Sequence, residues 1–63
     1  MTSKQLLDAA KSGRNDIVLV LLKENVKIVN GRDQLNGETA LHLAAFNGHN
    51  VVVQTLLENH ATV

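Results

Sequence analysis

The 63-residue chain carries the same sequence pattern twice, at a spacing of 35 residues. When residues 6–28 are aligned with residues 41–63, 8 of the 23 positions are identical. Chance would give about one or two identities in a chain of this composition. Repeats of this length are typical of arrays in which each unit buries its apolar side against a neighbouring unit. The sequence therefore predicts a repeat architecture. The identical pairs are Leu6/Leu41, Ala9/Ala44, Ala10/Ala45, Gly13/Gly48, Asn15/Asn50, Val18/Val53, Leu21/Leu56 and Leu22/Leu57.

Each copy is predicted to form two short helices separated by a glycine turn. In the first copy, Thr2 and Gln5 have the spacing of a capping box, so a helix should begin near Ser3. Gly13 should end this helix, because glycine adopts a left-handed conformation at low cost. Asn15 is then expected to cap a second helix.

The second helix of each copy should end at a residue that tolerates a positive φ. In the first copy that residue is Asn25, and in the second copy it is His60. The rest of the second copy follows the order of the first. Thr39 should cap its first helix, Gly48 should end that helix, and Asn50 should begin the last helix.

Residues 26–38 connect the two copies. The β-branched residues at positions 26, 28 and 29 and the Asn-Gly pairs at 30–31 and 36–37 indicate an extended or hairpin-like loop that projects from the helices. The Asn-Gly pairs are equally compatible with simple flexible turns.

Composition excludes several classes of function. Six basic and six acidic residues give a formal net charge of zero, so the chain lacks the electrostatic footprint of a protein that binds nucleic acid or acidic membranes. The chain has no Trp or Tyr and one Phe, which leaves no platform for base stacking. It has no Cys, which excludes disulfides and cysteine-ligated zinc and favours an intracellular protein, cytoplasmic or nuclear.

The second copy resembles the ankyrin repeat. Residues 37–49 read Gly-Glu-Thr-Ala-Leu-His-Leu-Ala-Ala-Phe-Asn-Gly-His and precede Val-Val-Gln-Thr-Leu-Leu at 52–57. The family's motif is Gly-x-Thr-Pro-Leu-His-Leu-Ala-Ala-x-x-Gly-His, followed by Val-Val-x-x-Leu-Leu. Ala40 stands where the family usually has Pro, and the 35-residue spacing exceeds the family's usual 33 or so. The first copy resembles an amino-terminal capping repeat, because Asp8 replaces an apolar residue on its outer side.

The resemblance implies an all-α solenoid of two helix-turn-helix units within one segment, residues 1–63. Repeat 1 would cover about residues 3–29, the loop about 30–38 and repeat 2 about 39–63. It also implies a non-catalytic module that binds a protein partner through loop tips and the concave helix face. A solvated loop with one stray leucine is the alternative for the loop residues. The candidate partner-binding residues are Arg32, Gln34, Leu35, Asn36, Glu38, Phe46 and Asn47.

The histidines are predicted to be structural rather than catalytic or metal-ligating. His42 and His49 lie seven residues apart, but no third ligand accompanies them. In the family, the histidine at position 42 bonds the hydroxyl of Thr39 and a neighbouring loop. No nucleophile with a suitable base, carboxylate pair or phosphate-binding loop is evident, so we expect neither enzyme activity nor a cofactor.

The end of the second copy is apolar, and solenoid repeats bury such faces against neighbours. We therefore expect the chain to be the amino-terminal part of a longer array. Two alternatives stay open: self-association through this face, and a regulatory or targeting segment of a larger protein. The residues that form the face are Leu43, Val52, Val53, Leu56 and Leu57.

Overall fold

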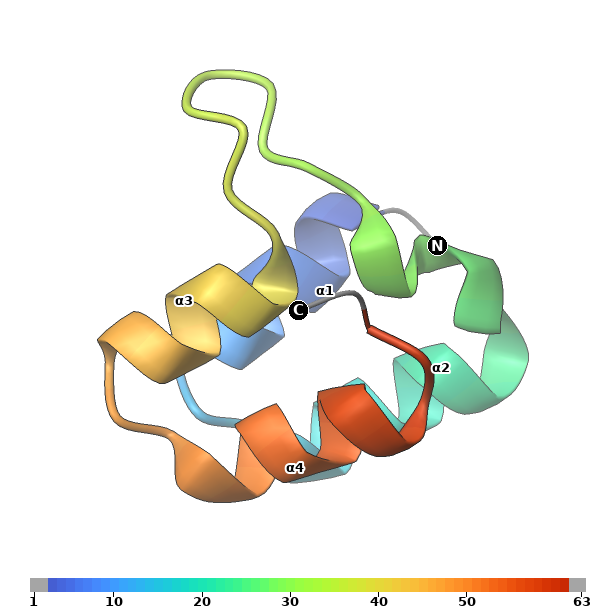
Figure 1. Ribbon diagram of the computed structural model, residues 1–63. Coiled ribbons are helices and arrows are strands. Elements are labelled where there is room, and N and C mark those ends of the chain that lie inside the picture. The colour runs from blue at the N-terminus through green and yellow to red at the C-terminus, as the bar shows by residue number, and fades with distance from the viewer. Residues whose placement is uncertain (1–2, 62–63) are drawn as a thin grey trace.

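A computed structural model describes residues 3–61, and over that range the chain forms two layers of paired helices (Figure 1). Helix α1 packs against α3, and α2 packs against α4, so that the two halves of the chain lie side by side. This confirms the predicted all-α fold with two helix-turn-helix units. The helices are α1 (Ser3–Lys11), α2 (Asn15–Glu24), the short 3-10 helix η1 (Val26–Asn30), α3 (Ala40–Phe46) and α4 (Asn50–Glu58).

Most predicted helix ends are confirmed. Gly13 and Gly48 follow the first helix of each repeat with φ values of 73° and 71°. Thr39 caps α3, and its side chain forms a capping box with His42. His60 has the predicted left-handed conformation, with φ 74°. Thr2, which was expected to cap α1, lies outside the described residues.

Two predictions about asparagine were wrong. Asn15 does not cap α2: it is the first helical residue, and its Oδ1 instead accepts a 2.7 Å hydrogen bond from Thr55 Oγ1 in α4. Asn25 follows α2 but has an extended conformation, with φ −155°, and its side chain accepts a hydrogen bond from the Lys27 backbone to cap η1. In both cases the amide oxygen accepts a hydrogen bond that the spacing of residues in the sequence does not predict.

The connection between the repeats is only partly a hairpin. Residues 26–30, expected to be extended, form η1, because Ile28 and Val29 turn into the core. Beyond it, a single antiparallel bridge joins Arg32 and Thr39. The loop between these two residues projects away from both helix layers, as predicted (Figure 1).

The core lies between the two helix layers and draws on both repeats. Small residues bring α1 and α3 close together, because Ala10 of α1 and Ala40 and Ala44 of α3 are fully buried. Ala45, the equivalent of Ala10 in the second repeat, is exposed. The reason is positional: Ala10 faces repeat 2, whereas no residue of 3–61 covers the corresponding side of repeat 2. The largest fully buried side chains are Leu6, Val18, Val52 and Leu56.

Candidate functional site

Asp33 organises the projecting loop. Its carboxylate Oδ1 accepts hydrogen bonds from the backbone N–H groups of Leu35 at 2.7 Å and Asn36 at 3.2 Å. Its own N–H donates to the Glu38 carbonyl at 2.8 Å, and its carbonyl accepts from the Gly37 N–H at 2.9 Å. This is the turn that aspartate side chains form with the backbone two residues on. Asp33 was not among the predicted site residues, although an Asp three residues before an Asn-Gly pair is the signal for such a turn.

Two of the predicted partner-binding residues also hold the loop in shape. Arg32 Nη1 donates to the Gly37 carbonyl at 2.9 Å, and Asn36 Oδ1 accepts from the Glu38 N–H at 3.0 Å. Leu35, between them, is 97% exposed at the end of the loop. The backbone around Leu35 is therefore fixed while its side chain is left to solvent.

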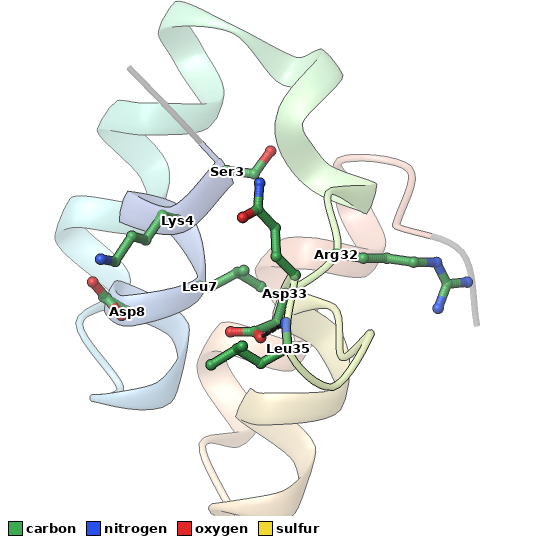
Figure 2. A pocket seen from close by; sticks show the side chains of 8 residues that line it. Ser3, Lys4, Leu7, Asp8, Arg32, Asp33 and Leu35 are labelled. Atoms are coloured by element: carbon green, nitrogen blue, oxygen red, sulfur yellow. Dashed lines mark hydrogen bonds between the residues drawn. The ribbon is translucent and has the colours of Figure 1, made fainter.

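The loop forms one wall of a hollow of about 510 Å³, and α1 forms the other (Figure 2). Leu7, a core residue, lies within it, and Asp33 and Leu35 lie on the loop side, whereas Arg32 extends away (Figure 2). The α1 wall was not predicted, because nothing in the spacing of the residues shows which helix lies beside the loop. The lining residues are Ser3, Lys4, Leu7, Asp8, Arg32, Asp33, Gln34 and Leu35.

Phe46 and Asn47 are not part of this hollow. They lie at the carboxyl end of α3, whereas the loop joins its amino end, so the length of α3 separates the two groups. Phe46 is 87% exposed. Asn47 Nδ2 donates to the Leu43 carbonyl at 2.9 Å and thus helps to end α3. The structure therefore gathers Arg32, Gln34, Leu35, Asn36 and Glu38 on one loop and places Phe46 and Asn47 elsewhere.

Both motif histidines have structural hydrogen bonds. His42 Nδ1 lies 2.9 Å from Thr39 Oγ1 and accepts from the Thr39 N–H at 3.2 Å. His49 Nε2 donates to the Lys11 carbonyl at 3.0 Å and so joins repeat 2 to the end of α1. The second of these contacts crosses between repeats and was not anticipated from the sequence.

The described part of the chain shows no further chemical site. Among residues 3–61, no three His, Asp or Glu side chains are grouped as metal ligands would be. Within the same range, none of the helices has both the length and the apolar character needed to cross a membrane. What remains is a fixed loop with an exposed leucine beside a hollow that has apolar and charged walls.

Two stacked helix pairs joined by a projecting loop define a short helical repeat array. The family model described as "Ankyrin repeats (3 copies)" matches residues 5–63, and the chain belongs to the ankyrin repeat family. "Ankyrin repeat domain-containing protein 49" of Bos taurus is 46% identical over 61 residues, which are 97% of this chain and 25% of that protein. "Ankyrin repeat-containing protein ITN1" of Arabidopsis thaliana is 36% identical over 58 residues, 92% of this chain and 10% of that protein. No solved structure matches the chain significantly.

Membership of the family fixes the general role. Ankyrin repeats are protein–protein interaction modules, and the family is generally non-catalytic. The chain spans no more than about a quarter of the length of these two relatives, so the activity of a whole protein is a separate question.

Proposed function

We propose that this chain is a non-catalytic module that binds a protein partner through its projecting loop and the concave surface beside it. The observation that carries the proposal is Leu35, whose side chain is 97% exposed on a backbone that Asp33 holds in place. A leucine with no role in the core contributes nothing to folding, whereas a preordered apolar contact loses little entropy on binding.

The hollow beside Leu35 indicates what the partner contributes. Leu7 and Leu35 offer apolar contact, and the rim has side chains of both charges, including Lys4, Asp8 and Asp33. A partner segment with one apolar side chain flanked by polar groups fits these walls. Neither a strongly acidic nor a strongly basic segment is favoured, because the rim charges are mixed.

Phe46 extends the proposed surface along α3. An exposed aromatic residue is a frequent anchor in protein interfaces. Because α3 separates Phe46 from the loop, a partner that contacts both Leu35 and Phe46 must lie along this helix. The surface we propose therefore runs from the loop to the carboxyl end of α3.

The test uses a binding protein selected from a display library against the wild-type chain. The double variant Leu35→Ser/Phe46→Ala is expected to raise its dissociation constant at least about tenfold, since large exposed anchors dominate interface energies. Circular dichroism should show the fold retained, because both side chains are exposed. Leu19→Ser is the matched control, since Leu19 is an exposed leucine on α2 outside the proposed surface.

Unchanged binding by the double variant would contradict the surface assignment, and so would a loss of helical signal equal to the loss of binding. If Leu19→Ser weakened binding as much, the partner would contact the outer helices instead.

We also propose that residues 1–63 are the amino-terminal part of a longer repeat array. The support is that both relatives are several times longer than the stretch they share with this chain. Leu41 and Val53 of repeat 2 are only partly buried, as expected of a face that takes another repeat. Of the residues predicted to form this face, Val52 and Leu56 are instead buried within the chain. The reading frame around the parent sequence tests this: further repeat motifs after residue 63 support it, and a stop codon there contradicts it.

A further inference from the structure

The chain contains Asn-Gly pairs at 30–31, 36–37 and 47–48. In this dipeptide an asparagine side chain reacts readily with the backbone nitrogen that follows it, because glycine has no Cβ to obstruct the approach. In an unfolded chain the three pairs should react at similar rates, since the reacting groups are the same. The structure places the three amide side chains in different surroundings, and Asn36 differs from the other two.

Hydrogen bonds and packing restrain Asn30 and Asn47. Asn47 Nδ2 donates to the Leu43 carbonyl at 2.9 Å, and its backbone N–H donates to the same carbonyl at 3.1 Å, so both groups belong to the end of α3. Asn30 Nδ2 donates at 3.5 Å to a backbone carbonyl just after α4. Gly31, which follows it, lies against Ser3, and a Cβ there would collide with that side chain. Reaction at either pair therefore has to break these contacts first.

Asn36, on the projecting loop, is held by its oxygen instead (Figure 1). Its Oδ1 accepts a 3.0 Å hydrogen bond from the Glu38 N–H, and among residues 3–61 no acceptor holds its Nδ2. The ring closed by this hydrogen bond contains Asn36 Cγ and Gly37 N, so the bond keeps these two atoms on the same side of the turn. A Cβ built on Gly37 would have no described neighbour within 4 Å, which leaves the approach open.

The glycine N–H groups do not distinguish the three pairs. Those of Gly31, Gly37 and Gly48 all donate to backbone carbonyl groups, at 3.0, 2.9 and 3.1 Å respectively. The nitrogen has to leave this hydrogen bond before it can attack, and the requirement is the same at each pair. Any selectivity among the pairs therefore comes from the asparagine side chains and their surroundings.

The hydrogen bond to Asn36 Oδ1 also activates the side-chain carbonyl. When a nitrogen adds to Cγ, Oδ1 becomes an oxyanion, and the Glu38 N–H is already directed at it. Arg32 Nη1 donates to the Gly37 carbonyl at 2.9 Å. This carbonyl and the Glu38 N–H belong to one peptide group, so the guanidinium makes that N–H a stronger donor. Asn36 thus has a donor in place for the charge that develops in the reaction.

We propose that Asn36 is a site of spontaneous deamidation, with water as the co-reactant. Hydroxide takes the proton of the Gly37 N–H, and this nitrogen forms a bond to Asn36 Cγ. The bond from Cγ to Nδ2 then breaks, and Nδ2 leaves as ammonia with a proton from water, which regenerates hydroxide. Water opens the resulting succinimide at one of its two carbonyl groups and gives aspartate or isoaspartate at position 36.

The product alters the loop that holds Leu35. Isoaspartate carries the main chain through the former side chain and so lengthens it, which displaces Gly37 from its hydrogen bonds to Asp33 and Arg32. Both products also add a negative charge between Asp33 and Glu38. A chain modified at Asn36 should therefore lose the ordered apolar contact and bind its partner more weakly. This consequence rests on the proposed function, whereas the reaction itself does not.

The test is incubation of the folded chain at mildly alkaline pH, followed by peptide mass spectrometry that distinguishes aspartate from isoaspartate at each position. An osmolyte stabilises the fold, and circular dichroism verifies it. Asn36 should react at least about tenfold faster than Asn30 and Asn47, since a preorganised oxyanion donor contributes a factor of about a hundred or more. In urea the three rates should converge. Equal rates at the three pairs in the folded chain overturn the proposal.

Arginine variants test the activation. Arg32→Ala should slow the reaction at Asn36 about threefold or more, and Arg32→Lys should retain most of the wild-type rate, because a charge-assisted hydrogen bond is about twice as strong as a neutral one. Arg14→Ala is the matched control, since Arg14 is an exposed arginine that precedes α2, at the other end of α1 from the loop. An Arg32→Ala chain that reacts at the wild-type rate contradicts the proposed activation.

A binding measurement separates this proposal from the proposed function. Ion exchange divides an aged sample into unmodified chain and chain with the additional negative charge. The unmodified fraction should keep its affinity for the display-selected binding protein, and the fraction modified at Asn36 should lose at least about tenfold, the effect expected when an interface anchor is lost. Selective modification without a change in affinity would support the reaction and contradict the loop as a binding surface.

Discussion

Replacing Gly13 with alanine tests the contact that locks the two repeats together. Gly13 has φ 73°, and a Cβ there would lie 2.6 Å from His49 Nδ1. The imidazole must move, which breaks its 3.0 Å hydrogen bond to the Lys11 carbonyl. The left-handed conformation costs about 1–2 kcal/mol for a residue with a Cβ, and the lost hydrogen bond about 0.5–1.5 kcal/mol. Gly13→Ala should therefore lower the free energy of unfolding by roughly 2–3 kcal/mol.

Gly48→Ala is the matched control. Gly48 has φ 71° and the same place in the second repeat, but nothing lies within 4 Å of its added Cβ. The backbone cost and the effect of alanine on the unfolded chain are then shared by both variants and cancel in the comparison. The difference isolates the His49 contact, at about 1 kcal/mol.

The assay is thermal unfolding followed by circular dichroism at low protein concentration. For a domain of this size, a difference of 1 kcal/mol corresponds to about 4–8 °C in the melting temperature. An osmolyte such as trimethylamine N-oxide brings a marginally stable small chain into the measurable range. Equal melting temperatures for Gly13→Ala and Gly48→Ala would refute the reasoning, because the clash with His49 would then have no energetic consequence.

Three further substitutions have expected outcomes in the same unfolding assay. Thr39→Ala removes the cap that joins Thr39 to His42 and should cost about 1 kcal/mol, whereas Thr39→Ser should restore most of it. Thr55→Val removes the hydroxyl that donates to Asn15 Oδ1 and should cost about 0.5–1.5 kcal/mol; an unchanged melting temperature would contradict the proposed tie between α2 and α4. Leu6→Ala empties a fully buried position and should cost about 2–5 kcal/mol, which is enough to unfold the chain without osmolyte.

The helix ends that depend on local chemistry alone were predicted from the sequence. The glycines that end α1 and α3 need a left-handed conformation, and Thr39 needs only its own neighbours to form a cap. These features recur at a fixed spacing, so the repeat could be recognised and its helices placed. The general role followed from the same motif, because the motif defines the family.

Features that depend on contacts between residues far apart in the chain were not predicted from the sequence. The β-branched residues after α2 predict an extended or hairpin-like loop, but Ile28 and Val29 are buried in the core and the backbone forms η1 instead. Asn15 has the side-chain chemistry of a helix cap. Its Oδ1 instead accepts a hydrogen bond from Thr55, forty residues away in the chain. Only part of the candidate site was predictable for the same reason: spacing identified the loop, whereas α1 as the second wall of the hollow depends on the packing of the helices.

The central claim is that the two halves of this chain are equivalent repeats stacked through one face. A nuclear Overhauser spectrum of the labelled chain at low concentration tests it most directly. The structure predicts cross-peaks from the Gly13 Hα protons to the His49 ring and from the Thr55 side chain to that of Asn15, with no imidazole cross-peak at Gly48. Cross-peaks from the His49 ring to Gly48 alone, with none to Gly13, would contradict the stacked arrangement.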